Sequence, residues 1–145
     1  WTITLAVTPD RAKFTRGIWP AHFPRLTQGQ GDLGQRMHRI FSNAWRGPVC
    51  IIGADIPDIS KHHICKAFKV LRGNDWVFGP ASDGGYWLIG TRRMSLHPPN
   101  LFKNVRWSSK DTLFDTLKTL PNARIGLIAA LRDVDTLSDL QKCNL

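Results

Sequence analysis

The chain has few cysteines and no long hydrophobic run, and both absences limit what kind of protein it can be. Its three cysteines show no Cys-x-x-Cys spacing. They predict neither a disulfide framework nor a zinc site, but small apolar residues in a reduced protein. No apolar stretch approaches the roughly 18 residues that a membrane span needs, and no charged-then-apolar leader opens the chain. We therefore expect a cytoplasmic protein with no membrane partner.

Internal repeats, low-complexity tracts and linker-like breaks in composition are absent from the sequence as well. The chain has 145 residues, enough for one domain that buries about two thirds of its unfolded surface. We therefore expect a single domain over residues 1–145.

Positive charge is in excess, because 20 Lys and Arg stand against 11 Asp and Glu and give a formal net charge of +9. Such a charge favours phosphorylated ligands or polyanions and raises their rate of encounter. A nucleic-acid-binding protein is expected to gather its basic residues in one stripe with interleaved aromatics. Here the basic residues are scattered over several expected elements, so a solvated basic surface is the plain explanation. Nucleic acid is not the expected partner.

Strand-like and helix-like hydrophobic patterns alternate along the chain. The segments expected as strands are 1–8, 49–54, 76–78, 86–89 and 123–131, with a short extended piece at 22–26. The segments expected as helices are 33–44, 60–72, 111–120 and a short one from 136. Strands that alternate with helices of about three turns predict βαβ units and a mostly parallel sheet. The expected fold class is therefore α/β.

Several of the apolar segments lead into loops that carry aspartates. These residues are Asp55, Asp83, Asp133 and Asp135. Open α/β sheets bind ligands at the carboxyl ends of their strands, so the four side chains are candidates for one ligand site. Carboxylates in this position can hold Mg²⁺ or Mn²⁺ while a phosphate supplies the remaining oxygens.

Plain structural explanations also exist for Asp58, Asp83, Asp133 and Asp135. Asp58, in the same loop as Asp55, can be an acid favoured at a helix N-terminus. Asp83 precedes two glycines, and Asp-Gly is the strongest short signal for a hairpin turn. Asp133 and Asp135 can be acids at a strand end and before a helix cap.

A glycine-rich segment, 28–36, leads into the first long helix and is a second candidate site. Backbone amides of such a loop at a helix N-terminus can bind anions. The segment lacks the Gly-x-x-x-x-Gly-Lys-Ser/Thr pattern of a P-loop, and a simple helix entry explains it too. Trp107, followed by two serines, offers a ligand an aromatic platform, although packing and capping account for it equally well.

Taken together, these motifs resemble a known family. The segments that carry the resemblance are, in order, QGQGDLGQRM, GPVCIIGADIPDI, VFGPASDGGYWLIGTRR, LFKNVRWSS, DTLFDTLKTLP and LRDVDTLSDL. They are similar to the GT-A-type glycosyltransferases of the arsenosugar-biosynthesis kind, in the nucleotide-diphospho-sugar transferase superfamily, whose wider relatives include nucleotidyltransferases. The resemblance spans essentially the whole chain. It implies a Rossmann-like three-layer α/β/α sandwich that binds a nucleoside diphosphate-sugar or a nucleoside triphosphate with a divalent metal.

The resemblance also implies roles for individual residues. Asp55 matches the acid of the family's Thr/Ala-Asp-x-Pro motif and Asp135 the acid of its Asp-Val-Asp-Thr motif, and both would bind Mg²⁺ or Mn²⁺. Asp83 lies in an Asp-Gly-Gly-Tyr motif near the sugar or acceptor and is the candidate orienting group or base. The substrate-binding candidates that the resemblance adds to Trp107 are Gln30, Gly31, Arg36, Gly84, Gly85 and Tyr86.

The family normally opens with a strand and a Lys-x-Pro-x-Pro-Gly-x-x-Lys-Thr-Arg-Leu loop that grips the base and phosphates, and no such motif precedes Trp1. We therefore expect an N-terminally truncated domain with an exposed sheet edge that favours homodimerisation. The leading hypothesis is a metal-dependent glycosyltransferase-like protein that uses a nucleoside diphosphate-sugar and a small-molecule acceptor of unknown identity. The alternatives are a nucleotidyltransferase that uses a nucleoside triphosphate, and an inactive binding or assembly module.

Overall fold

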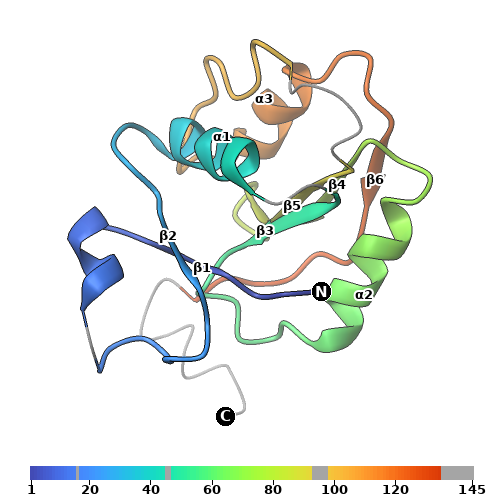
Figure 1. Ribbon diagram of the computed structural model, residues 1–145. Helices are drawn as coiled ribbons and strands as arrows, with labels where there is room; N and C mark the ends of the chain where they lie inside the picture. Colours follow the sequence, from blue (N-terminus) through green and yellow to red (C-terminus); the bar gives the residue numbers. More distant parts are fainter. Residues whose placement is uncertain (16, 45–46, 93–97, 135–145) are drawn as a thin grey trace. The chain divides into compact units, whose positions relative to one another are not determined.

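The computed structural model describes residues 1–15, 17–44, 47–92 and 98–134. The chain divides into two compact units, Trp1–Trp45 and Arg46–Leu145, each with its own sheet (Figure 1). The expectation of a single domain over the whole chain stays a prediction.

The first unit holds a two-stranded parallel sheet and one long helix. Its elements are β1 (Leu5–Val7), the 3₁₀ helix η1 (Asp10–Phe14), β2 (Arg25–Thr27) and α1 (Leu33–Asn43). β1 pairs with β2 in parallel, with Leu5 opposite Arg25. Both strands are shorter than expected. The hydrophobic pattern does not predict a helix at the position of η1.

Helix α1 begins at a capping box. The Gln35 backbone N–H donates to the Asp32 carboxylate at 2.8 Å, and the Asp32 backbone N–H donates to the Gln35 side chain at 3.0 Å. Met37 and Phe41, one turn apart, are buried as the helical period predicts. The helix has 11 residues. No helix in the described part of the chain is long and apolar enough to cross a membrane.

The second unit is built on a four-stranded sheet in the order β3-β5-β4-β6. Its elements are β3 (Val49–Ile52), α2 (Lys61–Val70), β4 (Trp76–Pro80), β5 (Tyr86–Thr91), α3 (Thr112–Lys118) and β6 (Ile125–Leu127). β5 is antiparallel to both β3 and β4, whereas β6 is parallel to β4. β3, β4 and β6 therefore run in one direction and β5 in the other.

This pairing confirms a mixed α/β fold, but it does not confirm a mostly parallel sheet. The reason lies in the turn between β4 and β5, which returns the chain at once and makes a hairpin in place of a βαβ unit. Gly84 has a positive φ of 91°, its N–H donates to the Ala81 carbonyl at 3.3 Å, and the Ala81 N–H donates to the Gly85 carbonyl at 3.1 Å. The three-layer sandwich stays a prediction.

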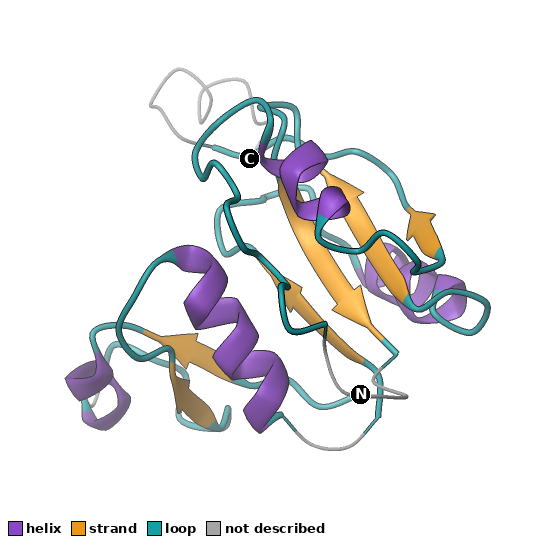
Figure 2. Cartoon of the chain, turned by 90° about the horizontal axis from the view of Figure 1, so that it is seen from above, coloured by secondary structure: helices purple, strands orange, loops and turns teal. Residues whose placement is uncertain are grey.

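Helices α2 and α3 lie on opposite faces of the four-stranded sheet (Figures 1 and 2). Tyr86 and Trp87 are consecutive residues of β5, so their side chains face opposite sides of the sheet. Trp87 packs in the core cluster with Ala67 of α2, whereas the Tyr86 hydroxyl lies 3.5 Å from Thr116 Oγ1 of α3. The sheet is thus covered by apolar contacts on both faces.

Two of the three cysteines lie in the second unit within the described residues, and both are free thiols. Cys50 is partly buried on β3 and packs against the core cluster, and its burial raises the pKa of the thiol to about 12. Cys65 is exposed on α2. Cys143 and the helix expected from 136 lie outside the described residues.

Candidate functional site

The carboxyl ends of β3, β4 and β6 meet at one edge of the four-stranded sheet, because these strands run in the same direction. Asp55 follows β3, Asp83 lies in the turn after β4, and Asp133 follows β6. The structure therefore brings three of the acidic candidates to the same edge, each from a separate segment.

The chain beyond β6 crosses this edge from β6 toward β3. The Leu131 N–H donates to the Pro80 carbonyl at 3.1 Å, beside a parallel bridge between Leu131 and Ala81. Three residues later the Val134 N–H donates to the Asp55 carbonyl at 3.0 Å. The crossing segment thus contacts the end of β4 first and the loop after β3 second, and it ties these two segments together.

A buried tryptophan supports the crossing segment from the sheet. The Trp87 indole N–H donates to the Ala129 carbonyl at 3.0 Å, and the side chain is almost fully buried. Its ring lies over Gly79, where an added Cβ would be 2.6 Å from the indole nitrogen. Glycine at this position is therefore required for the ring to reach the crossing segment.

Side chains also join at this edge. The Ser82 hydroxyl lies 3.5 Å from Asp133 Oδ1, a long hydrogen bond that links the turn after β4 to the crossing segment. Asp133 is half-buried, whereas Ser82 and Asp83 are exposed. Within the turn, the Gly85 N–H donates to Asp83 Oδ1 at 2.8 Å, which fixes the carboxylate relative to its own backbone.

Asp55 is exposed in the loop between β3 and α2. The Gly53 N–H donates to the Trp87 carbonyl at 2.9 Å and so extends the pairing of β3 with β5 up to the loop. The Asp55 carboxylate folds back toward Gly53. Its Oδ1 lies only 2.7 Å from the position that a Cβ on Gly53 would occupy. Ile56 is buried directly after it and anchors the loop in the core.

Asp58, the other acid of this loop, does not cap the helix that follows. Ser60 is the N-cap of α2, and its backbone N–H donates to Nδ1 of His63 at 3.2 Å. The Ser60 hydroxyl lies 3.1 Å from the same nitrogen. Asp58 is exposed two residues before this cap, where a carboxylate is compatible with the helix dipole.

The turn that carries Asp83 is packed tightly against the segment before α3. The Leu113 N–H donates to the Gly84 carbonyl at 3.0 Å. A Cβ on Gly84 would lie 2.5 Å from both Cα and the carbonyl carbon of Lys110. Glycine at this position therefore serves close backbone approach as well as positive φ.

Tyr86 has contacts that assign its side chain to the packing under α3. Its ring contacts Phe78 edge-on, with the centroids 5.3 Å apart, and its hydroxyl pairs with Thr116. Burial raises the pKa of the Tyr86 hydroxyl far above its usual range. The candidate role of Tyr86 in substrate binding finds no support in these contacts.

Trp107 is half-buried in the segment before α3, and its ring lies 5.9 Å from that of Phe102.

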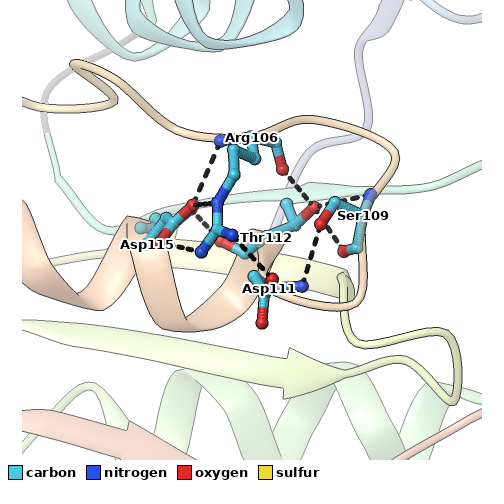
Figure 3. A network of polar contacts seen from close by, with 6 residues as sticks. Arg106, Ser109, Asp111, Thr112 and Asp115 are labelled. Atoms are coloured by element: carbon cyan, nitrogen blue, oxygen red, sulfur yellow. Dashed lines mark hydrogen bonds and ion pairs between the residues drawn. The ribbon is translucent and has the colours of Figure 1, made fainter.

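Its neighbour Arg106 forms an ion pair with Asp115 of α3, for which the sequence pattern offers no signal (Figure 3). Hydrogen bonds from Arg106 lower the pKa of Asp115 to about 2, and the Asp115 side chain in turn raises the pKa of Arg106.

The glycine-rich loop belongs to the first unit, where two arginines hold its carbonyls. Arg36 Nε donates to the Gly31 carbonyl at 2.9 Å. Arg39 donates to the carbonyl of Gln28 and, at 3.1 Å, to that of Gln30. The carboxylate of Asp32 caps the helix that follows. The arginines and the helix N-terminus therefore already have protein partners at this loop.

The side chains at the sheet edge carry oxygen atoms of the kind that a hard divalent cation prefers. Asp55 and Asp133, with the Ser82 hydroxyl, supply oxygen atoms only, which Mg²⁺ and Mn²⁺ prefer over zinc-type ligand sets. Among residues 1–134, apart from the gaps given above, no group of three or more His, Cys, Asp or Glu is arranged to hold a metal ion. Asp135, an expected metal ligand, lies outside the described residues; the residue before it is Val134, which bonds to Asp55.

Comparison with known proteins places the chain in a family. The family model described as "Uncharacterized protein conserved in bacteria (DUF2064)" matches residues 1–109, about three quarters of the sequence. The chain belongs to the DUF2064 family. No curated protein matches it.

A solved structure is similar to this DUF2064 chain over almost its whole length. It is the crystal structure of a "putative nucleotide-diphospho-sugar transferase" from Desulfovibrio desulfuricans G20, with a TM-score of 0.70 and 30% sequence identity. The match covers 94% of this chain and 61% of that one, so the DUF2064 chain spans about three fifths of the length of this relative. The resemblance to the nucleotide-diphospho-sugar transferase superfamily is confirmed at this level.

Proposed function

We propose that this chain is glycosyltransferase-like and binds a nucleoside diphosphate-sugar at the edge where β3, β4 and β6 end. The observation that carries the proposal is the meeting of the three acidic segments there, through the Val134–Asp55 and Ser82–Asp133 hydrogen bonds. The likeness to a protein described as a nucleotide-diphospho-sugar transferase supports the class of ligand. Ligands bind at the carboxyl ends of strands in open α/β sheets, which supports the location.

Asp55 and Asp135 are the proposed ligands of a divalent cation, Mg²⁺ or Mn²⁺. The backbone bond between Val134 and Asp55 favours this pair, because it holds the chain directly before Asp135 beside the first ligand. Asp133, already at the edge, is a further oxygen donor. When bound, the cation would supply positive charge that screens a diphosphate leaving group.

Asp83 is the proposed orienting group or base for the acceptor. In glycosyl transfer, an acceptor hydroxyl attacks the anomeric carbon, and the bond from that carbon to the diphosphate oxygen breaks. The Asp83 carboxylate is exposed and is held by the Gly85 N–H, so it can receive the hydroxyl proton without rearrangement of the turn.

The other expected features belong to the proposal as well. Trp107 is proposed to lie beside the ligand, and Gln30, Gly31 and Arg36 stay candidate nucleotide-binding residues of the first unit's own glycine-rich loop. The proposal further includes membership of the arsenosugar-biosynthesis kind of glycosyltransferase, a three-layer sandwich, a cytoplasmic location and a homodimer that forms through a sheet edge.

Isothermal titration calorimetry with nucleoside diphosphates, with and without Mn²⁺, tests the proposal. We expect saturable binding that requires Mn²⁺ and that weakens by more than about tenfold in Asp55→Asn, a loss of about 1.4 kcal/mol. Asp58→Asn is the matched control, because it removes the same charge from the same exposed loop. Equal affinity in wild type and Asp55→Asn, or equal losses in both variants, would contradict the proposed site.

Product analysis separates the two transferase reactions. A glycosyltransferase incubated with a nucleoside diphosphate-sugar releases the nucleoside diphosphate, whereas a nucleotidyltransferase incubated with a nucleoside triphosphate releases diphosphate. Release of diphosphate alone would replace the glycosyl proposal by the nucleotidyl one. Binding without either product would favour the inactive module.

A further inference from the structure

Arg106 is the centre of a polar network at the start of α3 (Figure 3). Its guanidinium binds Asp115 through two hydrogen bonds, at 2.7 Å from Nε and 3.0 Å from Nη2, and the backbone N–H of Arg106 adds a third at 3.3 Å. The remaining guanidinium nitrogen, Nη1, lies 2.8 Å from Asp111 Oδ2. The Asp115 side chain is only 10% exposed, whereas that of Arg106 is 59% exposed. The arginine thus covers a nearly buried carboxylate and supplies its hydrogen-bonding counter-charge.

The network also shapes the backbone between Arg106 and α3. Thr112 Oγ1 lies 2.8 Å from the Arg106 carbonyl oxygen and 2.7 Å from that of Ser109. The Asp111 N–H donates to the Ser109 hydroxyl at 3.2 Å. We call residues 106–112 the clamp segment. Its two ends are joined by the hydrogen bond from Thr112 to the Arg106 carbonyl and by the Arg106–Asp111 ion pair, so it forms a closed loop at the start of α3.

The turn that carries Asp83 packs against the clamp segment. The carbonyl of Gly84 accepts the Leu113 N–H, and the Gly84 backbone approaches Lys110 so closely that a Cβ would not fit. Gly85, the next residue, donates its N–H to the Asp83 carboxylate. A change in the position of Lys110 must therefore move Gly84, and with it the hydrogen bond that orients Asp83.

We propose that Arg106 is a positioning residue: its ion pair with Asp115 holds the clamp segment in place, and the clamp segment sets the orientation of the Asp83 carboxylate. Arg106 acts through Lys110 and Gly84 and does not itself need to touch a ligand. The effect on transfer to the acceptor rests on the proposed function, whereas the effect on the turn does not.

A second ion pair in the same sheet provides a matched control. Arg124 binds Asp75 through two side-chain hydrogen bonds, at 3.2 and 3.3 Å, and a backbone N–H bond at 2.9 Å, which is the same geometry. Asp75 and Arg124 directly precede β4 and β6, so this pair lies at the opposite edge of the sheet. Loss of the control pair removes the same pattern of hydrogen bonds, although from a carboxylate that is 40% exposed where Asp115 is 10% exposed, and it leaves the clamp segment in place.

Amide hydrogen exchange followed by NMR tests the positioning role in the unliganded protein. We expect Arg106→Ala to speed exchange of the Gly85 and Leu113 amides by about tenfold relative to the Ile128 amide, which donates to β4. Arg124→Ala is expected to leave the Gly85 to Ile128 ratio unchanged. If Arg106→Ala does not fold, Arg106→Lys keeps the charge, loses the two-pronged contact, and should give a smaller change in the same direction.

Release of nucleoside diphosphate from a nucleoside diphosphate-sugar that the wild type binds supplies the second readout, because Asp83 is proposed to act on the acceptor. At a temperature where all variants are folded, Arg106→Ala should slow this release several-fold while its Mn²⁺-dependent affinity for the nucleoside diphosphate stays that of wild type, and Arg124→Ala should match wild type in both. An unchanged Gly85 to Ile128 ratio in Arg106→Ala would overturn the positioning role whatever binds. If wild type binds no nucleotide, the proposed function fails, and the exchange ratio alone decides this inference.

Discussion

Replacement of Gly84 by alanine is expected to destabilise the protein strongly, because two separate features exclude a side chain there. The residue has a φ of +91°, in the left-handed region that favours glycine. An added Cβ would also lie 2.5 Å from backbone atoms of Lys110, which cannot move aside as a flexible side chain can. Both features belong to the turn that orients Asp83.

The magnitude can be estimated from these two terms. A left-handed conformation costs a residue with a Cβ about 1–2 kcal/mol. Forcing an extra carbon into a packed site costs about 1–3 kcal/mol. The sum is about 2–5 kcal/mol, and at about 2–4 °C per kcal/mol for a chain of this size it lowers the Tm by about 4–20 °C.

Thermal and urea unfolding of three glycine variants separates the two terms. Gly47 has a φ of +111° but nothing within 4 Å of an added Cβ, so Gly47→Ala should show the conformational term alone, about 1–2 kcal/mol. Gly73 has neither feature, and Gly73→Ala should be neutral or stabilising by up to about 1 kcal/mol. If Gly84→Ala lost no more stability than Gly47→Ala, the close contact with Lys110 would be refuted.

Three further predictions concern single side chains. Gly53→Ala should displace the Asp55 carboxylate, whose Oδ1 lies 2.7 Å from the new Cβ, so Mn²⁺-dependent nucleotide binding measured by calorimetry should fall several-fold while the Tm changes little. Arg106 lowers the pKa of Asp115 from 3.8 to about 2, so the pair stabilises the fold fully above about pH 4 and loses this effect as pH falls through 2. Between pH 4 and pH 2 the free energy of urea unfolding should therefore depend less on pH in Asp115→Asn than in wild type. Burial raises the pKa of the Cys50 thiol to about 12 and keeps the thiol protonated. In a variant whose other cysteines are serine, Cys50 should therefore react with a disulfide reagent at pH 8 only after unfolding. Rapid reaction of the folded protein would show that β3 is open.

The elements whose causes are local could be predicted from the sequence. The start of α2 at Ser60 and the end of α1 before Gly47 follow from caps and helix breakers, and the structure places both helices within a few residues of the expected ranges. The hairpin after β4 was signalled by Asp83 and Gly84 as well. The general expectation of βαβ units favours a mostly parallel sheet, which the antiparallel pairing of β5 does not confirm.

The site could be predicted only in part. A common strand direction places Asp55 and Asp133 at one edge, and that argument needs the sequence alone. The bond from Val134 to Asp55 joins residues about eighty positions apart, and no periodicity encodes such a pairing. The Arg106–Asp115 pair is equally hidden, because many basic residues stand near many acids in sequence, and only the packing of α3 selects one pair.

Paramagnetic broadening by Mn²⁺ tests most directly whether the acidic segments form one cation site. In an NMR titration with substoichiometric Mn²⁺, amide signals of residues 54–56, 82–85 and 133–134 should broaden together, while those of Asp75 and Arg124 at the opposite edge should stay sharp. Asp55→Asn should reduce the broadening of all three segments at once. Broadening confined to one segment, or equal broadening at both edges, would show that these carboxylates do not share a cation.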